Sequence, residues 1–192
     1  MTDKSIRIDC VPVIYNGTSF RSTTEARWAV FFDYLGIDYE YEKEQVSLET
    51  GGVYIPDFYL PQLEMYIEVK PNNLSIIENE YQKPIQMRKQ VDSNMIFIGL
   101  GIPRIDDNYL YRIELDDNPL TDTYRYYSFY EDRRDDGIFW LGSEDENGSP
   151  YHFFDVGGWG SPTDHDRYPI KSKSLIAAIN KSTNATFEDR AA

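Results

Sequence analysis

One short segment limits the possible architecture more than any other. The run Met95-Ile-Phe-Ile-Gly-Leu100 contains no polar side chain, which is typical of a strand covered on both faces of its sheet. Such a strand needs packing layers on both sides, and a chain of 192 residues, 41% of them apolar, can supply them. A layered fold with a buried sheet is therefore expected.

The segments before this run read as a helix followed by three strands. Ser22-Thr-Thr-Glu25 is a capping-box pattern, and it predicts a helix from there to about Leu35, with Gly36 ending it. This helix is apolar nearly all round, so we expect it to be buried on more than one side. Strands are predicted at residues 38–46, 53–60 and 64–70, with a turn at residues 61–63.

A second helix is predicted before the apolar strand. Ser75-Ile-Ile-Glu78 is another capping box, and the pattern extends to about Val91. Pro84 lies inside this pattern and lacks a backbone donor, which predicts a kink or two shorter helices. The expected order is therefore helix, three strands, helix, strand.

A boundary is predicted where loop-forming residues cluster, at residues 101–108. It separates a core at 1–103 from an aromatic-rich extension at 104–192 that packs on the core. In the extension we expect strands and a short terminal helix, at residues 109–115, 124–130, 137–141, 151–156 and 173–181. Asn147-Gly148 predicts a hairpin turn between the last two strands.

The charge of the chain excludes some functions. The formal net charge is −14, so a non-specific coat on nucleic acid is not expected, because phosphate binding depends on clustered Lys and Arg. Residues 104–155 hold 14 acidic and 5 basic side chains. Any contact with nucleic acid must therefore be local.

The expected location is the cytoplasm. No apolar run approaches the ~20 residues of a membrane span, and the first residues have no signal-peptide pattern. A single cysteine, Cys10, excludes an internal disulfide and a cysteine-built zinc site. We expect no membrane partner.

The residues with the clearest chemical meaning lie in the second and third predicted strands. Side chains alternate along a strand, so Glu68 and Lys70 share one face. If the two strands form a hairpin, Asp57 comes level with them. Two carboxylates suit Mg²⁺, and a lysine beside them can stabilise charge developing on a phosphorus atom. The group therefore suits phosphodiester hydrolysis.

Simpler interpretations exist for the same residues. A Glu-x-Lys pair on a strand usually marks a solvated charged face, and Pro-Asp alone is a turn signal. Glu25 has a structural role as the third residue of the capping box. It is also in register with a mostly inward helix face, where a carboxylate is costly to bury unless it is paired or bound to metal.

Several short motifs together resemble the PD-(D/E)xK nuclease superfamily, and in particular small phage-encoded nuclease-like proteins. The motifs are Phe20-Arg-Ser22, Thr24-Glu-Ala-Arg-Trp-Ala29, Leu35-Gly-Ile37, Tyr39-Glu-Tyr-Glu42, Pro56-Asp-Phe58 and Glu68-Val-Lys-Pro71. The resemblance covers roughly residues 15–103. It implies an α/β (α+β) fold with a restriction-endonuclease-like αβββαβ core, here followed by the acidic β-rich extension and its short terminal helix.

The resemblance also implies roles for particular residues. Asp57 and Glu68 match the metal-binding acids, Lys70 the catalytic lysine, and Glu25 the additional acid that many members place beside the metal. The implied cofactor is Mg²⁺, for which Mn²⁺ can substitute, and the implied activity is endo- or exonuclease. The substrate expected is nucleic acid, with DNA favoured over RNA.

Basic and polar residues near this site are candidates for contacts with the nucleic-acid backbone. They are Arg21, Arg27, Lys83, Gln86 and Lys89, and each singly also fits a solvated surface. Because such residues are few, weak binding with a shallow salt dependence is predicted.

A function from another class stays open. The scaffold can be a catalytically inactive protein-binding module, such as a phage accessory protein or a DNA-mimicking inhibitor. Residues 104–155 would then be the surface for a basic protein partner. A solvated insertion that keeps the chain soluble also explains this acidic segment.

Overall fold

The computed structural model describes residues 11–72, 82–90, 95–104, 110–113, 124–131, 139–144, 150–156 and 172–189. Within them, eight strands form one mixed sheet in the order β12-β11-β10-β9-β8-β7-β6-β3. In that order the strands are Pro150–Val156, Phe139–Glu144, Tyr124–Glu131, Leu110–Ile113, Met95–Leu100, Met65–Lys70, Phe58–Leu60 and Glu40–Tyr41. The predicted mixed α and β class is confirmed.

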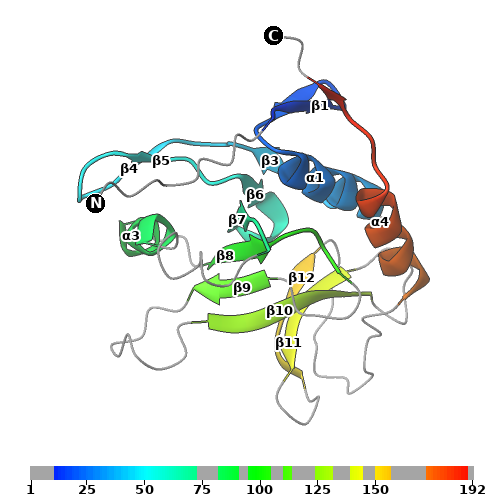
Figure 1. Ribbon diagram of the computed structural model, residues 1–192. Helices are drawn as coiled ribbons and strands as arrows, with labels where there is room; N and C mark the ends of the chain where they lie inside the picture. Colours follow the sequence, from blue (N-terminus) through cyan, green and yellow to red (C-terminus); the bar gives the residue numbers. More distant parts are fainter. Residues whose placement is uncertain are drawn as a thin grey trace, which may run out of the picture.

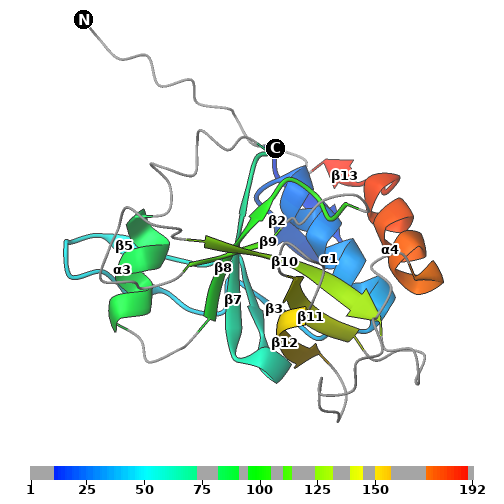
Figure 2. The same ribbon diagram turned by 90° about the horizontal axis from the view of Figure 1, so that it is seen from below.

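Helices lie on both sides of this sheet. Helix α1 (Thr23–Leu35) and helix α4 (Lys173–Thr183) pack side by side, whereas α3 (Gln82–Gln90) lies apart from them across strands β7 and β8 (Figures 1 and 2). A two-stranded ribbon, β4 (Val46–Ser47) and β5 (Val53–Tyr54), contacts α3. The strand predicted to be covered on both faces, β8, is buried from Ile96 to Leu100.

Helix α1 begins and ends as predicted. The Ser22 side chain accepts a hydrogen bond from the Glu25 N–H at 3.2 Å, and Gly36 adopts a left-handed φ of 69° that returns its own N–H to the last carbonyls. Only glycine adopts this conformation without cost, so the helix stops there. Most of its side chains are buried, because the sheet lies on one side and α4 on another.

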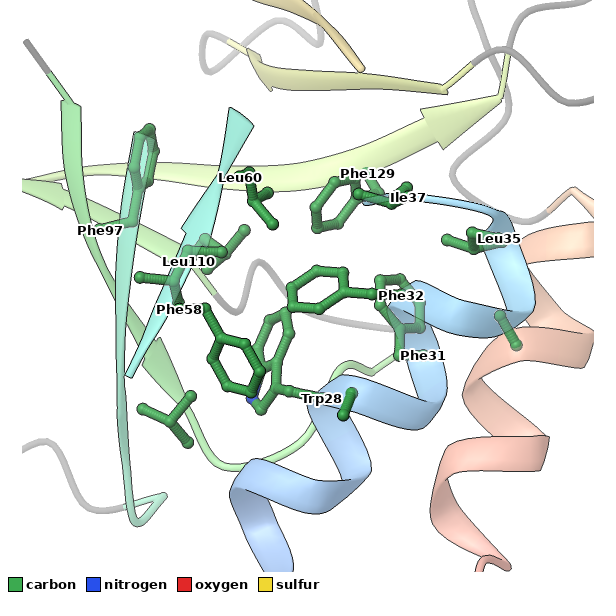
Figure 3. Close-up of a cluster of buried hydrophobic side chains, with 14 of the residues drawn as sticks. Trp28, Phe31, Phe32, Leu35, Ile37, Phe58, Leu60, Phe97, Leu110 and Phe129 are labelled. Carbon is green, nitrogen blue, oxygen red and sulfur yellow. The ribbon is translucent and has the colours of Figure 1, made fainter. Parts of the chain in front are cut away.

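An aromatic core fills the space between α1 and the sheet (Figure 3). The Phe32 ring is central, with ring centroids 5.5 Å from both Trp28 and Phe58 and 6.3 Å from Phe129. Phe129 comes from β10, in the predicted extension, so aromatic packing joins the two halves of the chain. The division at residue 103 stays a prediction, and β8 and β9 continue the sheet across it.

Strands β7 and β8 are parallel, whereas the other neighbouring strands described in this sheet pair antiparallel. A parallel pair needs a crossover connection, and α3 lies within it. Pro84 occupies the first turn of α3, where a missing N–H has little cost. The start of the predicted helix, at Ser75, lies outside the described residues.

Two predicted strands are wrong as continuous elements. The segment 38–46 is divided between β3 and β4, and Glu42 between them has a left-handed φ of 48°. The segment 53–60 is divided between β5 and β6, because Pro56 cannot donate to a ladder. In each case the chain leaves one sheet for the other.

The predicted elements of the second half are present at close to their predicted positions. Strands β9 to β12 extend the sheet as an antiparallel series, and α4 begins at the Ser172 cap. The predicted hairpin turn at Asn147-Gly148 lies outside the described residues.

A separate three-stranded sheet joins the ends of the chain. It contains β13 (Glu188–Asp189), β1 (Val13–Tyr15) and β2 (Thr18–Phe20), in that order.

No described helix has the length and apolarity needed to cross a membrane.

Candidate metal and catalytic site

Asp57, which immediately precedes β6, lies opposite Glu68 of β7. Phe58 pairs with Ile67 in the antiparallel β6–β7 ladder, so the preceding Asp57 is in register with Glu68. The Asp57 Oδ2 atom accepts the Val69 N–H at 2.7 Å, which holds this carboxylate against β7. The predicted hairpin therefore forms, and it brings the two acids level.

Glu68 forms two contacts that hold its carboxylate in place. Its Oε1 atom is 2.8 Å from the Lys70 ammonium, and its Oε2 atom accepts the Tyr54 hydroxyl at 2.8 Å. Glu68 is only 7% exposed, because Tyr54 and α3 cover this face of β7. The interpretation of Glu-x-Lys as a solvated strand face is therefore wrong for Glu68.

Arg21 joins three carboxylates at the edge of the site. Its Nη2 atom binds Asp57 Oδ1, its Nε atom is 2.8 Å from Glu42 Oε1, and Nε is 3.9 Å from Glu25 Oε2. Half of the Arg21 side chain is exposed, whereas Asp57 is 2% exposed. The guanidinium thus lies between a buried carboxylate and solvent.

Glu25 belongs both to the helix cap and to this site. Its Oε1 accepts the Ser22 hydroxyl at 2.8 Å, while its Oε2 accepts the Tyr41 hydroxyl at 2.5 Å and the Arg21 N–H at 3.2 Å. The position in the first turn also favours a carboxylate, because the N-terminal end of a helix dipole is positive. The two interpretations of Glu25 are therefore compatible.

Burial controls the electrostatics of Asp57. Burial raises the pKa of its carboxyl well above the ordinary value, and the charges of Glu68 and Glu25 raise it further. The Val69 N–H and the Arg21 charge oppose that rise. Glu68 and Glu25 therefore both oppose ionisation of the Asp57 carboxyl.

The donor set fits a small hard cation. Mg²⁺ usually takes one or two carboxylates and keeps several waters, and Asp57 and Glu68 supply two at neighbouring strand positions. The contact network consists of two neighbouring groups, Arg21 with Glu25, Glu42 and Asp57, and Lys70 with Glu68. Together they contain four carboxylates and two cations, a formal excess of two negative charges. Within the described part of the chain, no group of three or more His, Cys, Asp or Glu side chains is arranged to hold a metal ion.

The other predicted nucleic-acid contacts are not part of this network. Arg27 binds the Thr183 carbonyl at the end of α4, so its described contact is structural. Gln86 accepts a hydrogen bond from Thr50 and thereby links α3 to the β4–β5 ribbon. Lys83 and Lys89 are exposed on α3.

Three members of the network were not selected from the sequence as site residues. Tyr54 donates to Glu68, Tyr41 donates to Glu25, and Glu42 pairs with Arg21. Tyr41 and Glu42 lie in the Tyr39–Glu42 motif, which was a signal that could have identified them. Tyr54 had no such signal, because it reaches Glu68 only through the ribbon that β5 forms with β4.

Comparisons of the chain with protein-family models, with curated proteins and with solved structures found no match in any of the three.

Proposed function

We propose that this protein is a metal-dependent nuclease of the PD-(D/E)xK type, with Mg²⁺ as cofactor and nucleic acid, preferably DNA, as substrate. The observation that supports this most is the convergence of the four residues selected from sequence. Asp57, immediately before β6, lies in register with Glu68 of β7, Lys70 pairs with Glu68, and Arg21 contacts both Asp57 and Glu25. The order α1, β3, β6, β7, α3, β8 also supports a restriction-endonuclease-like core.

In this proposal Asp57 and Glu68 hold the divalent cation. When bound, that cation would polarise a phosphate oxygen and lower the pKa of a water molecule. The rest of the chemistry belongs to the side chains. The Val69 N–H and the Tyr54 hydroxyl fix the two carboxylates, and Lys70 carries a positive charge that can stabilise the phosphorane-like transition state.

Access to the site is consistent with a large polymeric substrate. The acids are buried, but Arg21 is half exposed and Glu42 is about one-third exposed at 34%, so the edge of the site is open to solvent. Residues 104–155 account for nine of the 14 excess negative charges of the chain. We place the protein in the cytoplasm, or in the host cytoplasm if a phage encodes it.

The test is cleavage of labelled single- and double-stranded DNA and RNA with Mg²⁺ or Mn²⁺. We expect the wild type to cleave, and Asp57→Ala and Lys70→Ala to lose about 10²–10³-fold in rate, the usual cost of removing one preorganised electrostatic group. Lys173→Ala is the matched control, because Lys173 is exposed on α4 and outside the network. Absence of cleavage by the wild type, or equal rates for all four proteins, would refute the nuclease proposal.

A second candidate function is supported by the pairing of the acids. Arg21 binds Asp57 and Lys70 binds Glu68, as in a scaffold whose ion pairs have a structural role. The protein would then be an inactive binding module, with a basic protein as its partner through residues 104–155. In that case the wild type neither cleaves nucleic acid nor binds Mg²⁺, and the Asp57→Ala variant loses stability only.

A further inference from the structure

We infer that Arg21 is a resident counter-ion of the metal site: it exchanges with the divalent cation at Asp57 and then binds a phosphate of the substrate. This inference rests on the proposed function, and it assigns Arg21 two successive partners: Asp57 first, and then a phosphate. It concerns the loop before α1, where Arg21 precedes the Ser22 cap.

The first argument is competition for one oxygen atom. Asp57 Oδ2 is already used by the Val69 N–H, and Oδ1 is bound by the Arg21 guanidinium. A cation that coordinates Asp57 through Oδ1 would therefore need the position that the Arg21 guanidinium occupies. Two positive charges at one buried carboxylate repel each other strongly, because a buried site screens charge poorly. Binding of the metal and the Arg21–Asp57 pair therefore exclude each other.

The second argument is that Arg21 can leave Asp57 without losing every partner. Its Nε atom is held by Glu42 at 2.8 Å, and Glu42 is itself partly exposed. A change of side-chain rotamer can move the guanidinium away from Asp57, and the partly exposed Glu42 carboxylate can follow it and keep the ion pair. Half of the side chain is already exposed, so the freed Nη atoms lie toward solvent rather than in the core.

The third argument is the chemistry of the group that is released. A guanidinium stays charged throughout the working pH range and presents a planar fork that matches two phosphate oxygens. Held at the edge of the site by Glu42, Arg21 would bind a phosphate beside the reacting one, or the reacting phosphate itself. The same side chain thus neutralises Asp57 before the metal binds and contacts substrate afterwards.

The test begins with metal binding, measured by titration calorimetry with MgCl₂ and MnCl₂. Arg21→Gln should bind Mg²⁺ about tenfold tighter than the wild type, which corresponds to about 1.4 kcal/mol. Lys43→Ala is the matched control: it removes a nearby exposed cation whose ammonium lies over the Tyr59 ring. Its Mg²⁺ affinity should stay within about twofold of the wild type, since solvent and salt screen an exposed charge.

The second measurement is binding and cleavage of DNA. Despite its tighter metal binding, Arg21→Gln should bind DNA about tenfold more weakly in Ca²⁺ and cleave it more slowly in Mg²⁺, because one charged phosphate contact is lost. Substitution of a residue with a purely structural role would not raise the affinity for Mg²⁺ while lowering the affinity for DNA.

The outcomes separate the inference from the function on which it rests. If the wild type binds Mg²⁺ and cleaves DNA while Arg21→Gln binds Mg²⁺ no tighter, the counter-ion role is wrong and the nuclease proposal stands. If the wild type neither binds metal nor cleaves, both fail.

A measurement on the unaltered chain covers the case in which the variant does not fold. The guanidinium NMR signal of Arg21 should sharpen into a single averaged signal when MgCl₂ is added to the wild type, because rotation is no longer restricted by Asp57. An unchanged Arg21 signal at saturating Mg²⁺ would refute the exchange.

Discussion

The two faces of strands β7 and β8 differ in what they bury. Toward α1, Ile67 and Phe97 join an aromatic core with Trp28, Phe32 and their neighbours. Toward α3, Ile98 and Tyr66 belong to a smaller cluster, and Glu68 lies on the same face of β7 as Tyr66. The α1 face buries apolar side chains, many of them aromatic, whereas the α3 face buries the Glu68 carboxylate beside its smaller apolar cluster.

This difference shows how one strand serves stability and chemistry at once. Alternation along β7 places Val69 in the core and Glu68 in the site without any change of backbone. Burial of side chains on the apolar face stabilises the fold. This stabilisation offsets the cost of burying a carboxylate on the other face, which is unfavourable even when the carboxylate is paired. Changes on the two faces should therefore have different consequences.

The largest effect on stability is expected from Phe32→Ala in the aromatic core. Phe32 is fully buried among several rings, so the variant should lose about 3–5 kcal/mol in free energy of unfolding, measured by urea denaturation. Tyr34→Ala, two residues further along α1 and half exposed, is the control and should change stability by less than about 1 kcal/mol. A similar loss in both variants would remove the contrast between core and surface.

A smaller loss is expected from Gly99→Ala on the same face of β8. A Cβ atom there would lie 2.9 Å from Cζ2 of Trp28, which is fully buried and fixed by a hydrogen bond from its Nε1 to the Gly101 carbonyl at 2.8 Å. We expect a loss of about 1–3 kcal/mol, as for other overpacked cores. Unchanged stability together with unchanged tryptophan fluorescence would show that Trp28 can move aside.

The last expected effect is a pH dependence of the free energy of unfolding, caused by Asp57 on the charged face. Burial raises the pKa of Asp57 in the folded protein, so above the unfolded value of about 3.9 the native state holds more protons than the unfolded chain. Stability conferred by the protonated form is therefore lost as pH rises toward the folded pKa, by at most about 1.4 kcal/mol per pH unit. In EDTA, Asp57→Asn should gain stability relative to the wild type across this range, measured by thermal unfolding.

Asp38→Asn provides the matched control, because Asp38 is exposed and accepts a hydrogen bond from the Gln62 amide at the surface. Its stability relative to the wild type should not follow the same pH trend. Parallel curves for the wild type and Asp57→Asn would mean that Asp57 titrates alike in the folded and unfolded states. Added Mg²⁺ should stabilise the wild type but not Asp57→Asn.

Local sequence patterns predicted the helices and strands best where a single physical signal sets the position of the element. The capping residue Ser22 and the terminating Gly36 bound α1, and unbroken apolarity marks β8. Predictions failed where the chain leaves one sheet for another within a single predicted strand. The segments 38–46 and 53–60 read as single strands, because nothing local shows that each contributes to two different sheets.

The contacts of the candidate site also divide into those that the sequence predicts and those that it does not. Asp57, Glu68 and Lys70 could be selected from spacing, since a hairpin and strand alternation bring them together. The Arg21 contacts to Asp57 and Glu42 could not, because they join segments that only the packing of α1 against the sheet brings together. The nuclease activity itself stays a prediction.

The amino-acid sequence alone determined the elements whose signals are local: a capped, apolar helix, an apolar strand, and two acids and a lysine at strand spacing. Hydrogen bonds within a turn and alternation along a strand act over a few residues, so these features can be read directly. Only the tertiary structure decided which acids are buried and which cations pair with them. Burial and charge pairing depend on segments distant in sequence, and Arg21 meets Asp57 only after α1 has packed against the sheet.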